Sequence, residues 1–220
     1  MTDTAALQRL LTWLSPAFPV GAFAWSQGLE TAIADGRIRT GADLKAWLDG
    51  LLAHGGPKTD AIILAHAHRE HADAGRLRDL ADLVLALTPS SERTLETTLT
   101  GENFALAARA WPSDVFARLP DRCPYPVAVG AIAAAHGLPL RDTLIGYLTA
   151  AVHSQVSVAV RLVPLGQTAG LQVMAGLEPA IAALAETAAT ASLNAIGGLA
   201  YASDIAQMRH ETLGVRVFRS

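Results

Sequence analysis

The chain is poor in cysteine, in aromatic residues and in charge. Cys123 is the only cysteine among 220 residues, so an intramolecular disulfide is excluded and we expect a reducing compartment, the cytoplasm. Aromatic residues make up 5% of the chain and charged residues only 17%. Soluble chains of this size normally carry more charge, so the shortage indicates that part of the apolar surface is covered by protein partners.

An excess of positive charge is also missing. The chain has 17 lysines and arginines against 20 aspartates and glutamates, which gives a net charge of −3. Binding to nucleic acid needs a concentrated excess of cations to meet the phosphates. We therefore expect no nucleic acid among its partners.

The apolar stretches are interrupted by polar groups or by proline. No cationic segment precedes the first apolar residues, and Pro16 and Pro19 break that run too early for a signal peptide. The most apolar stretch, residues 144–163, contains His153 and Arg161. An ionisable group is costly inside a bilayer, so we interpret this stretch as a buried helix and expect no membrane association.

Alanine and leucine, which favour helix, supply most of the 51% hydrophobic content. No long run alternates strictly between apolar and polar residues, as a half-buried strand would. We therefore predict an all-α fold, a single domain over residues 1–220 built as a bundle of roughly nine to ten helices. Gly36 is expected to end one helix in a left-handed conformation, and Thr40 to cap the next. The expected helices lie at about residues 7–14, 25–35, 40–54, 60–72, 76–87, 90–110, 127–136, 140–162 (the longest) and 168–190.

Residues 204–220 form a C-terminal arm of unusual composition. The arm contains three arginines, a histidine and a glutamate, together with the apolar residues Met208, Val217 and Phe218. A disposable tail is usually polar, because it has nothing to bury, whereas this mixture of cations and apolar anchors is typical of a segment that docks on another surface. The alternative is a last helix and a frayed end that pack on the chain's own core.

The best metal-binding candidates are the histidines of one predicted helix. His66 and Glu70 share one face of that helix, and His68 and His71 share another. Neither face supplies three ligands, so a zinc or nickel site would need help from elsewhere. The alternative is a solvated polar face, and we expect neither a bound metal nor another cofactor.

No catalytic set emerges from the remaining polar residues. Cys123 has no base near it in sequence, and both phosphate-binding glycine motifs are absent. Gln155 is expected to be a buried, hydrogen-bonded residue of an apolar helix. Arg161 on the same helix must reach water, an acid or a partner. The residues by themselves favour a helical binding protein over an enzyme, and an unrecognised hydrolase ranks last.

Three segments resemble a known family. They are residues 15–30 (SPAFPVGAFAWSQGLE), residues 155–168 (QVSVAVRLVPLGQT) and the ending, MRHET at 208–212 with RVFRS at 216–220. In order and spacing, along nearly the whole chain, they resemble the urease accessory protein UreF family. The chain departs from that pattern at Ala24-Trp25, where the family more often has Ser-Tyr, and at the less polar residues 213–215.

The resemblance implies a non-catalytic, all-α chaperone needed for nickel insertion into apo-urease. Members of this family dimerise and bind the accessory protein UreD, also called UreH. Through that complex they recruit the GTPase UreG, engage apo-urease and regulate GTP-dependent nickel delivery. The alternative hypothesis belongs to another class of protein function. It is a histidine-based nickel-binding carrier that uses His66, His68 and His71.

The resemblance also gives roles to single residues. Pro16, Pro19 and Gly21 would fix a rigid turn that presents the following helix, where the alternative is an ordinary interhelical loop. Glu30 would be an acidic contact for the GTPase, against the alternative of a solvated helix charge.

The other assigned residues lie in the apolar helix and in the arm. Gln155 and Arg161 would lie near the dimer interface or an internal water path, with core hydrogen bonding as the alternative. Six residues of the arm would order on UreD: Arg209, His210, Glu211, Arg216, Phe218 and Arg219.

Overall fold

Two largely buried helices, α4 (Gly56–Arg69) and α7 (Tyr125–Ala135), form the centre of the computed structural model, which describes residues 4–220. Most of their side chains are buried, because neighbouring helices cover them on nearly every side. At Gly130 the two backbones come so close that an added Cβ would lie 2.4 Å from the carbonyl oxygen of Leu64. Within residues 4–220 there are ten α-helices, three short 3-10 turns and no strand, which confirms the all-α prediction.

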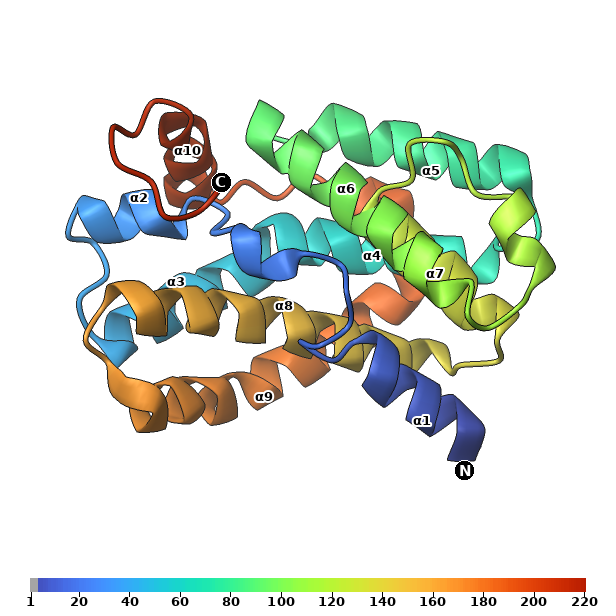
Figure 1. Cartoon of the computed structure of the whole chain (residues 1–220), viewed down its shortest axis with the longest axis horizontal. Coiled ribbons are helices and arrows are strands. Elements are labelled where there is room, and N and C mark those ends of the chain that lie inside the picture. Colours follow the sequence, from blue (N-terminus) through green and yellow to red (C-terminus); the bar gives the residue numbers. More distant parts are fainter. Residues whose placement is uncertain (1–3) are drawn as a thin grey trace.

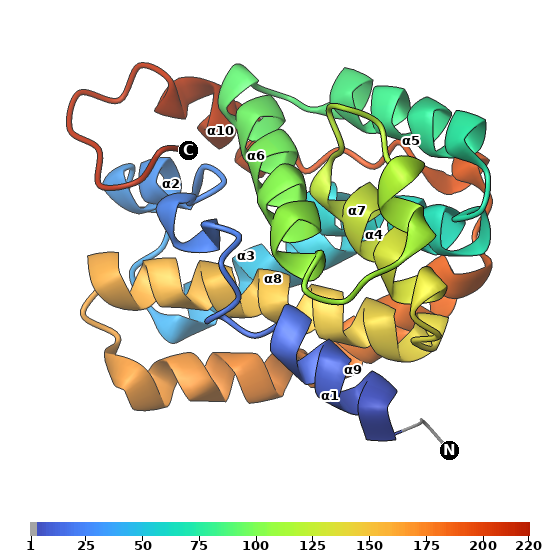
Figure 2. The ribbon, with the colours of Figure 1, turned by 45° about the vertical axis from the view of Figure 1, so that its right-hand side comes forward.

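The other long helices surround this pair (Figures 1 and 2). Helices α8 (Leu140–Leu162) and α9 (Gly166–Thr190) lie side by side along one edge, together with α3 (Gly41–His54). On the opposite edge α6 (Ser91–Ala108) packs against α7, and α5 (Ala74–Leu87) lies against α4. The first helix, α1 (Thr4–Trp13), and the short α2 (Leu29–Ala34) both rest on α8.

Helices α8 and α9 are long and apolar enough, by length and composition, to cross a membrane. In the structure 50% of the most apolar window of α8 and 33% of that of α9 is buried inside the bundle. Both helices pack on each other and on α3 and α4. The buried part of each helix therefore belongs to the bundle core, as the sequence predicted for residues 144–163 of α8.

Several helix boundaries follow the local signals in the sequence. The Thr40 hydroxyl accepts a hydrogen bond from the Asp43 N–H (3.2 Å) and the Asp43 carboxylate accepts one from the Thr40 N–H (2.9 Å), so a reciprocal cap begins α3. The Ser90 hydroxyl caps α6 without a reciprocal bond, by accepting a hydrogen bond from the N–H of Arg93 (3.1 Å). Gly36 has φ +71°, the left-handed conformation expected of it.

Some predicted details of the helices are wrong. The helix expected at 25–35 begins only at Leu29, because Gln27 (φ +52°) and Gly28 (φ +78°) both have left-handed backbones that no helix continues through. Helix α4 starts earlier than expected, at Gly56, since Pro57 fits its first turn. The longest helix is α9, with 25 residues, rather than α8, with 23.

The last helix and the end of the chain return to the N-terminal part of the molecule (Figures 1 and 2). Helix α10 (Tyr201–His210) lies beside α2, so the predicted arm begins in the middle of a helix. Residues 211–220, which we call the tail, form no helix and loop back to residues 24–30. Gly28 permits the close approach of α10, because a Cβ there would lie 2.6 Å from the backbone nitrogen of Gln207.

Candidate functional site

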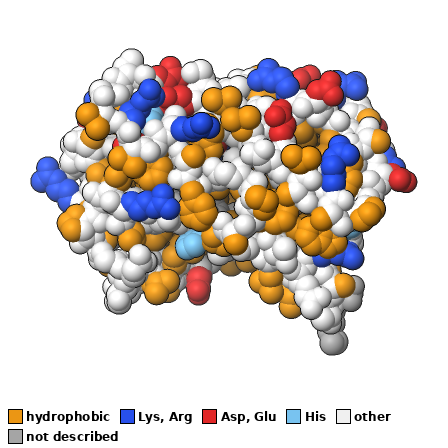
Figure 3. All heavy atoms as spheres, in the orientation of Figure 1, with side chains coloured by type: hydrophobic (Ala, Val, Ile, Leu, Met, Phe, Trp, Pro, Cys, Tyr) orange, Lys and Arg blue, Asp and Glu red, His pale blue; other side chains and the backbone are white. Residues whose placement is uncertain are grey.

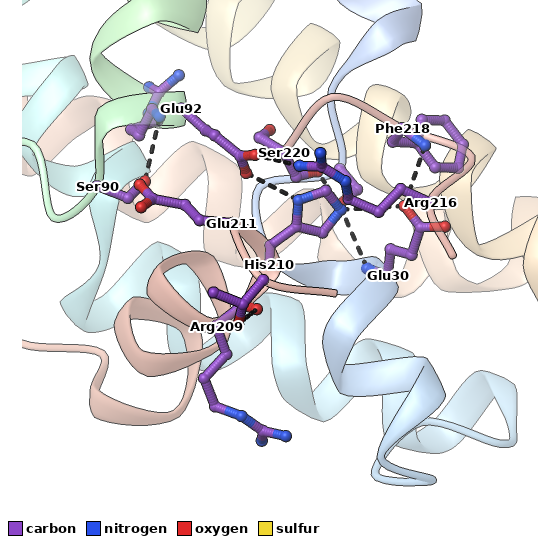
Figure 4. Close-up of polar contacts among 12 residues, drawn as sticks. Glu30, Ser90, Glu92, Arg209, His210, Glu211, Arg216, Phe218 and Ser220 are labelled. Atoms are coloured by element: carbon purple, nitrogen blue, oxygen red, sulfur yellow. Dashed lines mark hydrogen bonds and ion pairs between the residues drawn. The ribbon is translucent and has the colours of Figure 1, made fainter. Parts of the chain in front are cut away.

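Glu30 is the residue on which the end of the chain converges (Figure 4). It lies in the first turn of α2 and is only 6% exposed. Its carboxylate accepts hydrogen bonds from the backbone N–H groups of Val217 (2.7 Å) and Phe218 (3.0 Å). Nε2 of His210 lies 3.1 Å from the same carboxylate. One buried acid therefore holds both the tail and the end of α10.

His210 joins this acid to helix α6. Its side chain is fully buried, and Nδ1 lies 2.8 Å from a carboxylate oxygen of Glu92 in the first turn of α6. The other oxygen of Glu92 accepts a hydrogen bond from Arg216 at 2.7 Å. Glu30, His210, Glu92 and Arg216 thus form a continuous row of ionisable groups, which we call the tail cluster (Figure 4).

Backbone contacts fix the last residues of the tail. The N–H of Arg219 donates to the carbonyl of Ala24 (2.7 Å), and the N–H of Ser26 donates to the carbonyl of Ser220 (2.7 Å). The Ser26 hydroxyl donates to the same carbonyl, and the Gln27 N–H donates to the Ser220 hydroxyl (3.2 Å). These bonds use the backbone groups of residues 24–27, which explains why that segment is not part of α2.

Arg161 and Arg219 add contacts between cations and aromatic rings. The Phe218 ring is 5% exposed, and the guanidinium carbon of Arg161 lies 5.9 Å from its centroid and 5.5 Å from that of Phe23. Arg219 lies over Trp25 at 5.7 Å. Such contacts are attractive because the ring face carries partial negative charge. Arg161, on α8, therefore helps to hold the tail against the segment before α2.

Two ion contacts at the surface complete the docking of α10 and the tail. Arg209 donates to Asp35 (3.1 Å to Oδ1), and this hydrogen bond lowers the pKa of Asp35. Glu211 accepts hydrogen bonds from the N–H (2.9 Å) and the hydroxyl (2.7 Å) of Ser91, which lower the pKa of Glu211. Exposed pairs of this kind contribute little stability, so the buried tail cluster carries most of the polar docking.

The structure brings together most of the residues that the sequence predicted as partner-binding. Glu30, Arg161 and all six residues of the predicted arm lie in one region. Glu30, however, faces the chain's own tail, so in this arrangement its carboxylate is occupied within the molecule. Glu92 is not among the residues predicted from the sequence, because its only signal is its place in the first turn of a helix.

The remaining predicted residues lie apart from the tail cluster. Pro16 and Pro19 are exposed on the turn after α1, and Gly21 (φ +79°) begins the 3-10 turn Ala22–Ala24 that presents Phe23, 46% exposed. Gln155 is buried on α8, and among the described residues its Oε1 has no hydrogen-bond partner.

The three candidate histidines contact backbone carbonyls. Nε2 of His66 lies 3.0 Å from the oxygen of Ala191, and Nε2 of His68 lies 2.8 Å from that of Leu138. Nδ1 of His71 lies 3.0 Å from the oxygen of His68. Burial lowers the pKa of His68. Between residues 4 and 220 no group of three His, Cys, Asp or Glu side chains is arranged to hold a metal ion.

Cys123 is buried, as expected for a packed thiol. Burial raises its pKa to about 12, so the nucleophilic thiolate is scarce at neutral pH. This thiol therefore offers no support for a nucleophilic mechanism.

Comparison with known proteins adds a second line of observation. The family model described as UreF matches residues 38–178. The chain is 49% identical over 218 residues to the "Urease accessory protein UreF" of Rhizobium leguminosarum bv. viciae, which covers 99% of this chain and 98% of the relative. The protein of that name from Agrobacterium fabrum (strain C58 / ATCC 33970) is 49% identical over 219 residues, 100% of this chain and 98% of the relative. The protein of that name from Rhodopseudomonas palustris (strain BisB5) is 48% identical over 225 residues. The match covers 99% of this chain and 93% of the relative.

Proposed function

The chain belongs to the UreF family of urease accessory proteins, which gives it a role in urease maturation, and we propose that it acts there as a non-catalytic scaffold. In this proposal it works in the cytoplasm, carries no cofactor of its own and assists nickel insertion into apo-urease. The exclusively helical build of residues 4–220 and the burial of its only thiol are in keeping with a binding role.

We propose that α10 and the tail bind UreD (UreH), and one observation carries this. In the arm, His210 is buried in the tail cluster and Arg216 pairs with Glu92 there, while several large apolar side chains remain outside. Tyr201, Ile205 and Met208 follow helical spacing on α10 and are 70%, 51% and 51% exposed. Val215 and Val217 on the tail are 85% and 69% exposed. Exposed apolar groups gathered on one segment are typical of a protein interface.

The tail cluster then has a positioning role in the same proposal. The docked tail holds residues 24–27 and, through Arg161, the exposed ring of Phe23. We propose that the segment leading up to residues 24–27, from Pro16 to Phe23, recruits the GTPase UreG, which delivers nickel to apo-urease in a GTP-dependent way. Glu30 acts on that contact indirectly, by fixing the tail, since its own carboxylate is buried.

We further propose that two copies of the chain pair through the face that α1, α8 and α9 share. A groove of about 660 Å³ runs there between Leu10, Leu14, Ile145 and Met174. Leu11, at its rim, is 66% exposed. Figure 3 shows apolar side chains gathered over α1 and the neighbouring part of α8. The low charge of the sequence fits an interface on this face.

The binding of UreD is tested by truncating the outer apolar groups of α10. The double variant Ile205→Ala, Met208→Ala leaves the tail cluster intact, and we expect it to weaken binding of a UreD homologue by about tenfold or more, since central apolar contacts contribute about 1–3 kcal/mol each. The affinity is measured by titration, with the helical circular dichroism as a check on folding. Leu106→Ala, at a side chain 69% exposed on α6, is the matched control and should change nothing. Unchanged affinity of the double variant would refute the proposed surface.

A further inference from the structure

Both ring nitrogens of His210 face carboxylates. Nε2 lies 3.1 Å from Oε2 of Glu30, and Nδ1 lies 2.8 Å from Oε2 of Glu92, around a ring that is 0% exposed. A neutral imidazole has one N–H and one bare lone pair, so it donates only one hydrogen bond. The second nitrogen would then turn its lone pair toward a carboxylate oxygen, with no water to separate them.

An extra proton on one of the carboxylates would remove the repulsion between the ring lone pair and the carboxylate oxygen. Both acids, however, already accept other hydrogen bonds. Glu30 accepts from the N–H groups of Val217 and Phe218, and Glu92 accepts from Arg216. Hydrogen bonds of this kind favour the ionised carboxylate. The ring is therefore the group that best carries the additional proton.

The charges of the surrounding elements agree with this placement. Helix α2 contributes Glu30, helix α6 contributes Glu92, and the tail contributes Arg216. The neighbouring charges are turned elsewhere, because Glu211 accepts from Ser91 and Arg209 pairs with Asp35. With a doubly protonated ring the tail cluster has two positive and two negative charges, and with a neutral ring it has a buried net negative charge.

We propose that His210 is held as an imidazolium when the tail is docked, so that docking of the tail takes up one proton. When the last turn of α10 leaves α2 and α6, the ring enters water, where imidazole is mostly neutral at neutral pH. The docked state then binds one proton more than the released state. By linkage, docking is favoured as pH falls, and it weakens as pH rises, by at most about tenfold per pH unit.

The structure thus contains a pH-sensitive latch. Release of the tail would free the backbone of residues 24–27 and remove Phe218 from Arg161. The latch depends only on contacts within this chain, so it holds whether or not α10 and the tail bind UreD. Its test uses the full chain without any partner.

The test observes the ring nitrogens of His210 directly, by nitrogen-15 nuclear magnetic resonance of the labelled full chain. The His210→Gln variant identifies the ring signals, and the amide signals of Val217 and Phe218 report whether the tail is docked. We expect both ring nitrogens to be protonated wherever the tail is docked, including mildly alkaline pH, and ring and amide signals to change together as pH rises. One protonated and one bare nitrogen in the docked protein would overturn the proposal.

Two glutamine variants sharpen this test. Glu92→Gln removes one of the two carboxylates, so His210 should become neutral near neutral pH and the coupling between ring and tail should be lost. Glu186→Gln is the matched control, because this glutamate pairs with Arg141 and belongs to α9, outside the tail cluster. It should leave the His210 titration as in the unchanged chain. An imidazolium that persists in Glu92→Gln with the same pH dependence would contradict the role of the paired carboxylates.

Discussion

At the scale of single residues, two glycines of the helical bundle differ sharply in what surrounds them. A Cβ on Gly101, in α6, would lie 2.0 Å from the carbonyl oxygen of Cys123 and 2.7 Å from the backbone nitrogen of Tyr125. A Cβ on Gly50, in α3, would meet no atom within 4 Å. Gly101 therefore permits close backbone packing between α6 and the segment that enters α7. Gly50 does not lie in a close packing contact of this kind.

We expect Gly101→Ala to destabilise the protein by about 2 kcal/mol or more, because backbone atoms cannot move aside as a flexible side chain can. Gly50→Ala should instead stabilise it by about 0.5–1 kcal/mol, since alanine favours helix over glycine. Urea unfolding followed by circular dichroism measures both. Equal midpoints for the two variants would contradict the packing argument.

Also at this scale, the sequence identified most residues of the site but not their contacts. Glu30, His210 and Phe218 were predicted as residues that meet partner proteins, through a family resemblance. Their observed partners are one another and Glu92. Glu30 and Val217 are 187 positions apart, and no local pattern connects residues at such a distance. The binding of UreD and UreG remains a proposal.

At the scale of elements, local signals explain most of the helix starts and fail at α2. Capping by Thr40 and Ser90 involves residues only three positions apart, so it is visible in the sequence. The start of α2 depends on contacts of residues 24–27 with the tail, which lies at the other end of the chain. The late start of this helix is therefore a tertiary effect.

The reciprocal cap of α3 supplies a prediction at this scale. Replacing Thr40 by alanine removes the acceptor for the Asp43 N–H, and we expect a loss of about 1 kcal/mol in the free energy of unfolding. Thr12→Ala is the control, because the Thr12 hydroxyl only donates to the carbonyl of Gln8 within exposed helix α1. Denaturant titration of both variants gives the comparison. A loss in Thr12→Ala as large as in Thr40→Ala would argue against a specific effect of the cap.

At the scale of the whole molecule, the end of the chain is held differently from the helical bundle. The centre is made of α4 and α7, buried on most sides. Helix α10 contacts mainly α2 and α6, and the tail depends on a few hydrogen bonds and one buried ring. Segments with few apolar contacts open without global unfolding. The tail and the bundle are therefore expected to open as separate units.

Hydrogen exchange measures this difference. The amides of Val217 and Phe218 donate to Glu30, and that of Arg219 donates to Ala24, so all three should be protected, but less than the amides of α7. Glu30→Gln should speed their exchange by about tenfold or more, since hydrogen bonds to a charged group contribute about 1.5–3 kcal/mol. Exchange in α7 should stay unchanged, as should all exchange in the tail of the Glu186→Gln control. A uniform increase over the whole chain would instead show that the tail is part of the bundle's cooperative unit.

The sequence by itself determined the helical class, most helix positions and the cap at Thr40, because periodicity and capping act over a few neighbouring residues. Its similarity to relatives along nearly the whole length also identifies the family. Only the tertiary structure decided where the arm's charges point. Glu30, Glu92 and His210 come from three helices far apart in the chain, and a buried charge is stable only where the fold brings its counter-charge within hydrogen-bond distance.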